Sequence, residues 1–260
     1  MNSVSKTLYI PLYGKALVSK RGLFLRDEMA VAIWEREAFP LKRKARSKWL
    51  AYYMGIRAAV FDDWVKGRFA ECEDAVVLHL GCGMDSRALR VGGASLWYDV
   101  DLPEVIAERK GYFPESDTYQ MLACDVRDGA FLAEVGAHKR AVVVMEGVGM
   151  YLTESELRGL FAAIAAHFDE VSLLADFYTA LGAQMSRIKN PVSEVGVRRV
   201  WGIDDPRVLE DGALRYERTH DMTPMHYVEQ LHGAERRIFR MLYAGAFAKK
   251  LYRLYEFKKG

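Results

Sequence analysis

The chain has 260 residues, of which 51% are hydrophobic and 28% charged, so its composition excludes disorder, collagen-like repeats and small disulfide scaffolds. Its 37 basic and 35 acidic residues nearly cancel, which argues against a nucleic-acid partner. The three cysteines form no CxxC pair and have no histidine cluster nearby, which argues against a metal site and favours a reducing cytoplasm. No apolar run approaches the roughly 18 residues that span a bilayer, so we expect no membrane contact.

The first part of the chain predicts helices. Leu25–Ala38 and Ser47–Phe69 have helical periodicity, and the second of these carries an apolar stripe that must face a core. We expect residues 1–73 to form a helical cap on the domain that follows.

From residue 74 to 260 the pattern predicts one doubly wound α/β domain. Short apolar runs that end in glycine or an acid are typical of parallel strands joined by crossover helices, here Pro103–Lys110 and Glu154–His167. The five expected strands are Ala75–Leu80, Ser95–Val100, Thr118–Ala123, Ala141–Met145 and Val171–Ala175.

The end of the chain completes this sheet. Two further strands, Leu214–Thr219 and Lys250–Phe257, with a helix Thr223–Leu231 between them, predict a closing antiparallel pair and a seven-stranded Rossmann-like sheet. The segment at about 179–213 fits neither period, and we expect it to be a substrate cover inserted between strands 5 and 6.

A glycine-rich turn follows the first strand, in Leu80-Gly81-Cys82-Gly83-Met84-Asp85-Ser86-Arg87. Glycines at Gly81 and Gly83 allow a tight turn and a close approach to a ligand. A dinucleotide fingerprint has glycine or alanine where this chain has Ser86, so the match to a dinucleotide site is imperfect. The alternative is a strand-to-helix turn without a ligand.

Acidic residues follow the next three strands at the same edge of the sheet. Asp101 lies 20 residues after Gly81, the position at which an acid binds ribose hydroxyls in nucleotide-binding α/β folds, and Asp99 precedes it on the same face. Asp125 could bind a second part of the same ligand, and Glu146 could hold a cationic amine. Helix capping explains Asp101 and Asp125 equally simply, and ordinary packing explains Glu146.

Two other side chains are candidates for the site. Arg57 lies within the apolar stripe of its helix, where a guanidinium needs an anion from a ligand or from a protein acid. Asp62 and Asp63 point elsewhere on that helix, which favours the ligand. Tyr151 follows Glu146-Gly147 and offers a ring face and a hydroxyl to a substrate, so we treat it as a candidate catalytic residue.

The motifs at Leu80–Arg87, Tyr98–Pro103, Asp125–Arg127 and Glu146–Leu152 together resemble one family of class I S-adenosylmethionine methyltransferases. This is the leucine carboxyl methyltransferase group, which includes the polyketide O-methyltransferases. The resemblance implies that Asp101 binds ribose, Asp125 faces adenine, Arg57 and Lys15 bind the carboxylate, and Glu146 faces the methionine end beside Gly81 and Gly83. It also implies a cofactor site that includes Cys82, Asp85, Arg87, Asp99, Val126 and Gly147.

The sequence therefore predicts methyl transfer from S-adenosylmethionine to a carboxylate or hydroxyl oxygen of a small, polyketide-like acceptor. A carboxylate needs no general base, and because no base stands out in the sequence, a carboxylate is slightly favoured. Two alternatives stay open. An NAD-linked oxidoreductase would share the turn and the ribose acid, and a non-catalytic protein would bind the cofactor without an acceptor.

Overall fold

A seven-stranded mixed sheet forms the centre of the computed structural model, which describes residues 8–37, 39, 41, 43–71, 74–93, 96–186, 200–210 and 212–260. Its strands are β1 (Val76–Leu80), β2 (Leu96–Asp101), β3 (Tyr119–Ala123), β4 (Arg140–Met145), β5 (Glu170–Tyr178), β6 (Arg215–His220) and β7 (Tyr252–Lys259). They follow the order β3-β2-β1-β4-β5-β7-β6, in which β1 to β5 are parallel and β7 runs antiparallel to both β5 and β6. The predicted seven-stranded Rossmann-like fold is confirmed.

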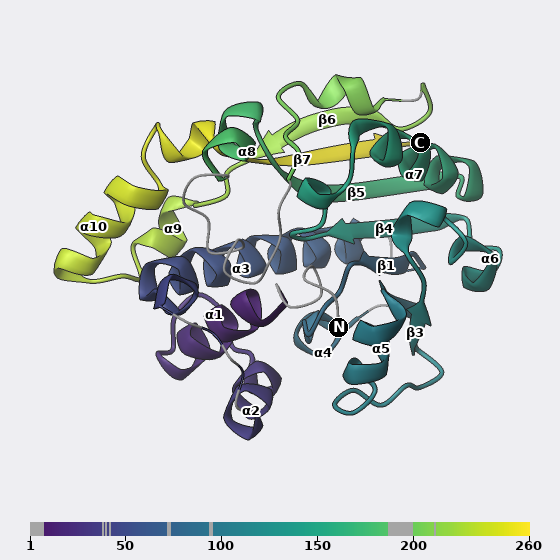
Figure 1. Ribbon diagram of the computed structural model, residues 1–260. Helices are drawn as coiled ribbons and strands as arrows, with labels where there is room; N and C mark the ends of the chain where they lie inside the picture. The colour runs from purple at the N-terminus through teal and green to yellow at the C-terminus, as the bar shows by residue number, and fades with distance from the viewer. Residues whose placement is uncertain are drawn as a thin grey trace.

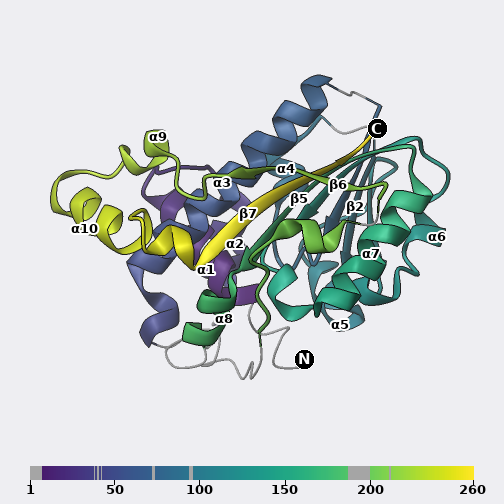
Figure 2. The same cartoon turned by 90° about the horizontal axis from the view of Figure 1, so that it is seen from above.

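The helices cover both faces of this sheet (Figures 1 and 2). They are α1 (Tyr9–Lys20), α2 (Glu28–Arg36), α3 (Lys48–Glu71), α4 (Arg87–Val91), α5 (Pro103–Arg109), α6 (Leu132–Val135), α7 (Glu154–His167), α8 (Ala180–Ser186), α9 (Met225–Val228) and α10 (Gly233–Tyr243). Short 3₁₀ turns follow several strands or precede helices: η2 (Arg43–Arg46), η3 (Val126–Asp128), η4 (Gly149–Tyr151), η6 (Pro206–Leu209) and η7 (Ala248–Lys250).

Strand side chains alternate between two cores, as a pleated sheet requires. Val77 packs with α3 and α10, through residues such as Phe61 and Phe239. Leu78 packs on the opposite face with α6 and α7. A capping box opens α7, because the side chains of Thr153 and Glu156 each accept a hydrogen bond from the other residue's backbone N–H.

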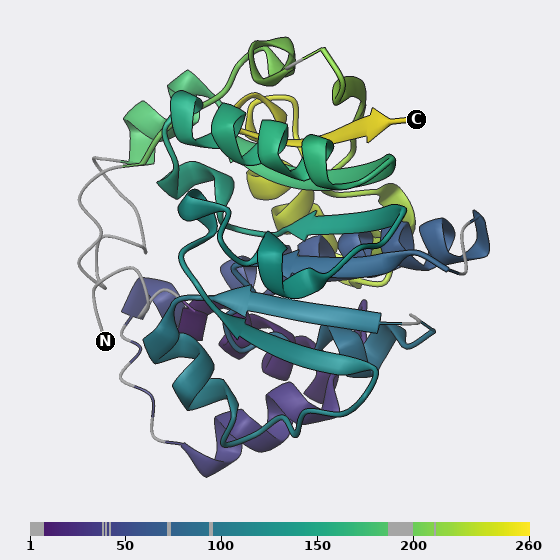
Figure 3. The same cartoon turned by 90° about the vertical axis from the view of Figure 1, so that its right-hand side faces the viewer.

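The helix α1 has no counterpart in the sequence prediction, because a central glycine weakens its helical signal. The structure shows why the glycine is there: a Cβ at Gly14 would lie 2.7 Å from the Met54 Cβ, and one at Gly55 would lie 2.7 Å from Val18. The two glycines let α1 and α3 pack in close contact. Figure 3 shows the purple N-terminal helices near the β3 end of the sheet, away from the yellow C-terminal strand.

One expectation for the second half of the chain needs correction, because the helix expected at Thr223–Leu231 is shorter and α10 follows it. In α10 only Phe239 is buried, whereas Met241 and Leu242 are exposed, as is Phe247 after the helix. The expected cover at about 179–213 contains α8 and η6, while its residues 187–199 and 211 lie outside the described residues. Within the described ranges, no helix is long and apolar enough to cross a membrane.

Candidate active site

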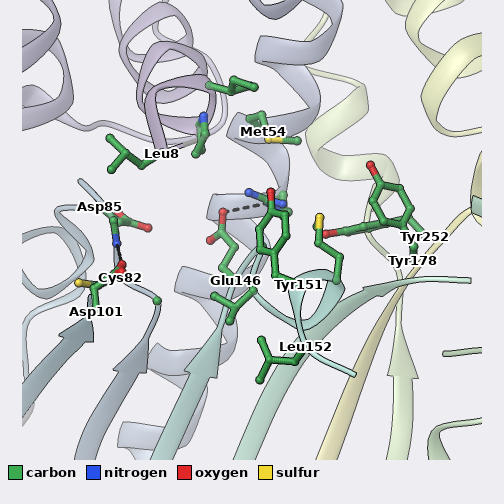
Figure 4. Close-up of a pocket in the computed structure, with 18 of the residues that line it drawn as sticks. Leu8, Met54, Cys82, Asp85, Asp101, Glu146, Tyr151, Leu152, Tyr178 and Tyr252 are labelled. Carbon is green, nitrogen blue, oxygen red and sulfur yellow. Dashed lines mark hydrogen bonds and ion pairs between the residues drawn. The ribbon is translucent and has the colours of Figure 1, made fainter. Parts of the chain in front are cut away.

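A cavity of about 610 Å³ lies over the carboxyl ends of the central strands, beneath α1 and α3 (Figure 4). Its polar end is formed by the turn after β1 and by the acids that follow β2, β3 and β4. Its aromatic end is formed by side chains of α3, α8, α10 and β7. Most sequence-predicted residues line it: Lys15, Arg57, Gly81, Cys82, Gly83, Asp85, Asp101, Asp125, Val126, Glu146, Gly147 and Tyr151.

The glycine turn is held by hydrogen bonds from both sides. Gly81 has φ +67°, and a Cβ there would lie 2.2 Å from Val148, so only glycine fits. The Gly83 N–H donates to Asp101 Oδ2 at 2.7 Å, while Arg109 donates to the Gly83 carbonyl at 2.9 Å. The backbone of the turn is therefore fixed against β2 and α5.

Asp101 has a geometry suited to hydroxyl groups. Its Oδ1 accepts from the Leu102 N–H at 2.7 Å and its Oδ2 accepts from Gly83, so each oxygen keeps acceptor capacity toward the cavity. Burial raises the pKa of this carboxyl, although the two backbone N–H groups oppose the rise. The N-cap residue of α5 is Leu102, one residue after Asp101.

Arg57 contacts two protein acids, although the sequence argument favoured a ligand as its anion. Its Nε donates to Glu146 Oε1 at 3.0 Å and one terminal nitrogen donates to Asp176 Oδ2 at 3.2 Å. The sequence argument considered only acids near Arg57 on the same helix, whereas both partners come from strand ends. Asp62 is occupied elsewhere, by Arg87 and Arg90.

Arg87 and Asp99 do not line the cavity, which corrects the expectation that both contact the cofactor. Arg87 is fully buried and donates to Asp62 at 2.7 Å, to His79 Nε2 at 3.2 Å and to Glu146. Glu146 lines the cavity, and the hydrogen bond from the buried Arg87 guanidinium fixes the orientation of its carboxylate.

Asp99 is likewise fully buried, with its oxygens already occupied. It pairs with Arg109 and accepts from Tyr119 and from the Trp97 indole, and it lies 3.1 Å from His79 Nδ1. Burial opposes its ionisation, but Arg109 and the hydrogen bonds prevail and hold its pKa at about 2. Asp99 and Asp101 lie on the same face of β2, but Asp101 ends the strand at the rim of the cavity, whereas Asp99 lies two residues earlier and supports the site from within the core.

Lys15 lies in the wall of the cavity. Its Nζ is 2.9 Å from Asp85, which also pairs with Arg90 at 2.7 Å. Burial disfavours the charged form of Asp85, but Arg90, Lys15 and Arg87 outweigh burial and hold its pKa well below the usual range.

Asp125 both lines the cavity and caps a turn. Its carboxylate accepts from the Arg127 N–H at 3.0 Å at the start of η3, and it pairs with the Arg127 guanidinium. The hydrogen bond from the Arg127 side chain lowers the pKa of Asp125. Val126 follows it in the cavity wall. Ligand binding and capping, the two interpretations of Asp125 made from the sequence, are thus compatible.

The glycines after β4 have different roles. The Gly147 N–H donates to Asp176 Oδ1 at 2.6 Å, and Gly147 lines the cavity. A Cβ at Gly149 would lie 2.5 Å from the Phe177 ring, so Gly149 makes room for core packing and not for a ligand. Tyr151 stands in η4 beside Glu146, between Asp101 on one side and the two tyrosines Tyr178 and Tyr252 on the other (Figure 4).

Sequence reasoning missed the acid at the end of β5 and the aromatic wall. Asp176 directly follows Ala175, which pairs with Met145, so Asp176 and Glu146 occupy neighbouring positions. The sequence does contain a signal for Asp176, because a carboxylate follows the expected strand Val171–Ala175 just as one follows each of the three strands before it. The wall residues carried no motif, because they are ordinary aromatic and aliphatic residues on separate elements: Tyr53, Met54, Tyr178, Met185, Leu242, Tyr243, Leu251 and Tyr252.

No group of three or more histidine, cysteine, aspartate or glutamate side chains is arranged to hold a metal ion in the part of the chain that the structure describes. The donor set in the cavity is instead a mixture of carboxylates and guanidiniums, which suits an organic ligand with charges of both signs.

Residues 4–165 match the family model described as leucine carboxyl methyltransferase. The chain is 31% identical over 228 residues to the tetracenomycin polyketide synthesis O-methyltransferase TcmP of Streptomyces glaucescens, covering 85% of this chain and 84% of that protein. It is 33% identical over 151 residues to the S-adenosyl-L-methionine-dependent methyltransferase dpfgK of Gibberella zeae, covering 52% and 51%.

Solved structures with low sequence identity share the fold. A DUF574 family protein from Streptomyces avermitilis superposes with a TM-score of 0.60 at 12% identity, covering 89% of each chain. Magnesium protoporphyrin IX methyltransferase from Synechocystis superposes with a TM-score of 0.50 at 14% identity, covering 88% of this chain and 94% of that one. The resemblance drawn from the sequence motifs is confirmed.

Proposed function

Because the chain belongs to the leucine carboxyl methyltransferase family and is an S-adenosylmethionine-dependent methyltransferase, we propose that it transfers the methyl group to an oxygen of a small-molecule acceptor. The observation that carries this proposal is a cavity in which an ion-paired polar end opens into an aromatic end. One cavity can hold both reactants next to each other.

The charge of the polar end fits the cofactor. Among the described residues that line the cavity, three carry a positive charge, Lys15, Arg57 and Arg127, and four are acids, Asp85, Asp101, Asp125 and Glu146. S-adenosylmethionine carries a sulfonium, an ammonium and a carboxylate, so its net positive charge complements this excess of acids.

Within this end, Asp101 would accept from the ribose hydroxyls, and Asp125 with Val126 would lie against the adenine. Arg57 and Lys15 would bind the carboxylate, since a guanidinium has five N–H donors and Arg57 uses only some of them on its two acids. Glu146 would accept from the ammonium, and Gly81 and Gly83 would let the methionine part approach the backbone.

When bound, the cofactor supplies a methyl group already activated on sulfur, so the protein needs no covalent intermediate. The protein contributes position: it holds the acceptor oxygen in line with the methyl group and keeps water away. Tyr151, between the two ends of the cavity, is placed to contact the acceptor.

The aromatic end supports a flat, apolar acceptor. Rings of Tyr53, Tyr178 and Tyr252 meet edge to face there, with centroids 4.8 Å apart for Tyr178 and Tyr252 and 6.4 Å for Tyr53 and Tyr252. The name of the Streptomyces glaucescens relative describes an O-methyltransferase of polyketide synthesis, and the aromatic wall here would suit a polyketide-like acceptor.

Calorimetry with S-adenosylhomocysteine and with NAD tests the cofactor. We expect binding heat from the first and none from the second, because Ser86 occupies the position of the third glycine in a dinucleotide fingerprint. Transfer of labelled methyl groups to a set of aromatic hydroxyl and carboxyl compounds then tests the activity. Tight binding of NAD, with no binding heat from S-adenosylhomocysteine, would contradict the proposal.

A further inference from the structure

Asp176 is a buried carboxylate with partners from three neighbouring elements. Its Oδ1 accepts from the Gly147 N–H at 2.6 Å. Its Oδ2 accepts from Arg57 at 3.2 Å and from the Tyr252 hydroxyl at 2.9 Å. Asp176 itself does not line the cavity, whereas Tyr252 does. The tyrosine therefore stands between a buried carboxylate and the space for an acceptor.

The hydroxyl of Tyr252 is oriented by Asp176. A phenol has one proton to donate and lone pairs that can accept. Because the Tyr252 proton points to Asp176, its oxygen can accept a hydrogen bond from a hydroxyl group in the cavity. Tyr252 starts β7 opposite Tyr178 of β5, and this register fixes the ring against the cavity wall.

The surroundings of Asp176 favour uptake of a proton. Burial raises the pKa of this carboxyl, and nearby Glu146 adds to the rise, while Arg57 and the hydrogen bonds oppose it. Arg57 is shared between Asp176 and Glu146, so one cation serves two carboxylates. The titratable groups that face the Asp176–Tyr252 pair are Arg57 and Tyr53 of α3, Glu146 after β4 and Tyr178 of β5.

The same surroundings disfavour a carboxylate acceptor. The described residues that line the aromatic end include no lysine or arginine apart from Arg57, whose remaining donors are assigned above to the carboxylate of the cofactor. Burying an acceptor carboxylate without a cation, next to Asp176 and Glu146, costs free energy, whereas a neutral hydroxyl has no such penalty.

We propose that Tyr252 is a catalytic residue that accepts the proton of an acceptor hydroxyl, and that Asp176 positions it and takes up its proton. This rests on the methyl transfer to oxygen proposed above. The acceptor O–H bond breaks and its proton moves to Tyr252 Oη, whose own proton moves to Asp176 Oδ2. The electron pair left on the acceptor oxygen forms the bond to the methyl carbon, and the pair of the broken carbon–sulfur bond stays on sulfur.

The first experiment lets a hydroxyl and a carboxylate compete within one molecule. The probe is 6-hydroxy-2-naphthoic acid, a flat aromatic compound with the two groups at opposite ends, incubated with S-adenosylmethionine labelled in the methyl group. Mild alkali releases labelled methanol from an ester and leaves an ether intact. We expect the label to remain in the ether. Release of the label as methanol would overturn the inference and support the proposed function, whereas absence of binding heat from adenosyl ligands would remove the proposed function itself.

The second experiment measures the pH dependence of kcat for naphthol methylation in Tyr252→Phe and Asp176→Asn. Loss of general-base assistance costs about 10²- to 10⁴-fold, so we expect kcat at pH 7 to fall at least about 100-fold in both variants. The deficit should shrink as pH rises, because ionised naphthol needs no base. Tyr252→Phe keeps the pair between Arg57 and Asp176, so it remains informative even if Asp176→Asn unfolds.

A control variant and a binding measurement separate chemistry from structure. Tyr255→Phe removes another buried hydroxyl from β7, one that donates to the Asp204 carbonyl at 3.1 Å outside the cavity, and should keep the kcat of the unmodified protein. Calorimetry should show S-adenosylhomocysteine affinity within about threefold in Tyr252→Phe. A kcat within threefold of the unmodified protein at pH 7, or a deficit that stays equal at every pH, would refute the role of Tyr252.

Discussion

The polar end of the cavity is fixed by ion pairs between buried side chains, whereas the aromatic end is formed by rings and aliphatic side chains from separate elements. In the polar end each charge depends on a partner, so removing one leaves another buried without compensation. In the aromatic end contacts are numerous and individually weak. The first region is therefore intolerant of substitution, and the second can change its shape without loss of the fold.

The largest expected effect is on the polar end, from Arg109→Met. Arg109 is fully buried and holds Asp99, the Gly83 carbonyl and the Asp85 carbonyl. Its loss leaves Asp99 as a buried charge, so we expect the free energy of unfolding to fall by about 3 to 5 kcal/mol in urea denaturation.

The matched control is the next residue on the chain. Lys110 pairs with Glu115 at 3.0 Å at the surface, and Lys110→Met should cost less than about 1 kcal/mol. Similar losses for the two variants would mean that the ion pairs of the polar end do not determine its stability.

A smaller effect is expected from Asp101→Ala, measured as affinity for S-adenosylhomocysteine. Loss of hydrogen bonds to a charged acceptor should weaken binding by about 1 to 3 kcal/mol. The exposed Asp128→Ala, at the same edge of the sheet, should bind as the unmodified protein does. If Asp101→Ala loses thermal stability but keeps its affinity per folded molecule, the carboxylate serves only the Gly83 turn.

Two buried acids that support the cavity, Asp99 and Asp176, should also respond to acid in opposite ways. The pKa of Asp99 is lowered from 3.8 to about 2, so its contribution is present above pH 4 and is lost as pH falls toward 2. The pKa of Asp176 is raised, so its protonated form is favoured by folding, and its contribution is present at low pH and is lost as pH rises.

Urea denaturation of Asp99→Asn and Asp176→Asn between pH 5 and 2 measures these opposite trends. The stability deficit of Asp99→Asn relative to the unmodified protein should shrink as pH falls, and the deficit of Asp176→Asn should grow. Parallel curves for the two variants would contradict the assignment of opposite shifts.

The smallest expected effect is on the aromatic end. Leu242 is 48% exposed and lines the cavity, so Leu242→Ala should change the free energy of unfolding by no more than about 0.5 kcal/mol. It should leave S-adenosylhomocysteine affinity unchanged and alter the KM for aromatic acceptors. A loss of cofactor affinity would show that the two ends are coupled through α10.

The polar end could be predicted from the sequence because its residues lie at the ends of strands, where a local pattern marks them. Asp101 and Glu146 each follow an apolar run, and Gly81 and Gly83 stand directly after the first. The pairing of these residues could not be predicted. Arg57 reaches Glu146 over 89 residues and Asp176 over 119, and the sequence contains no signal at those separations.

The aromatic end could not be predicted, because tertiary contacts and not periodicity decide which aromatic residues face a cavity. Phe239 and Leu242 lie on the same helix, yet one is fully buried and the other exposed. Tyr252 belongs to a strand whose sequence pattern is typical of a buried core strand, and its place at the start of β7 brings it to the cavity.

The strand order has a consequence for how the protein folds. The edge strand β6 pairs with β7, which comes later in the chain and itself pairs with β5, so the place of β6 in the sheet depends on β7. The parallel strands β1 to β5 precede both and carry the glycine turn with its acids. Non-local pairing of this kind is slow. We therefore expect the cofactor end to assemble first during folding, and the acceptor wall with Tyr252 to be completed in the last step.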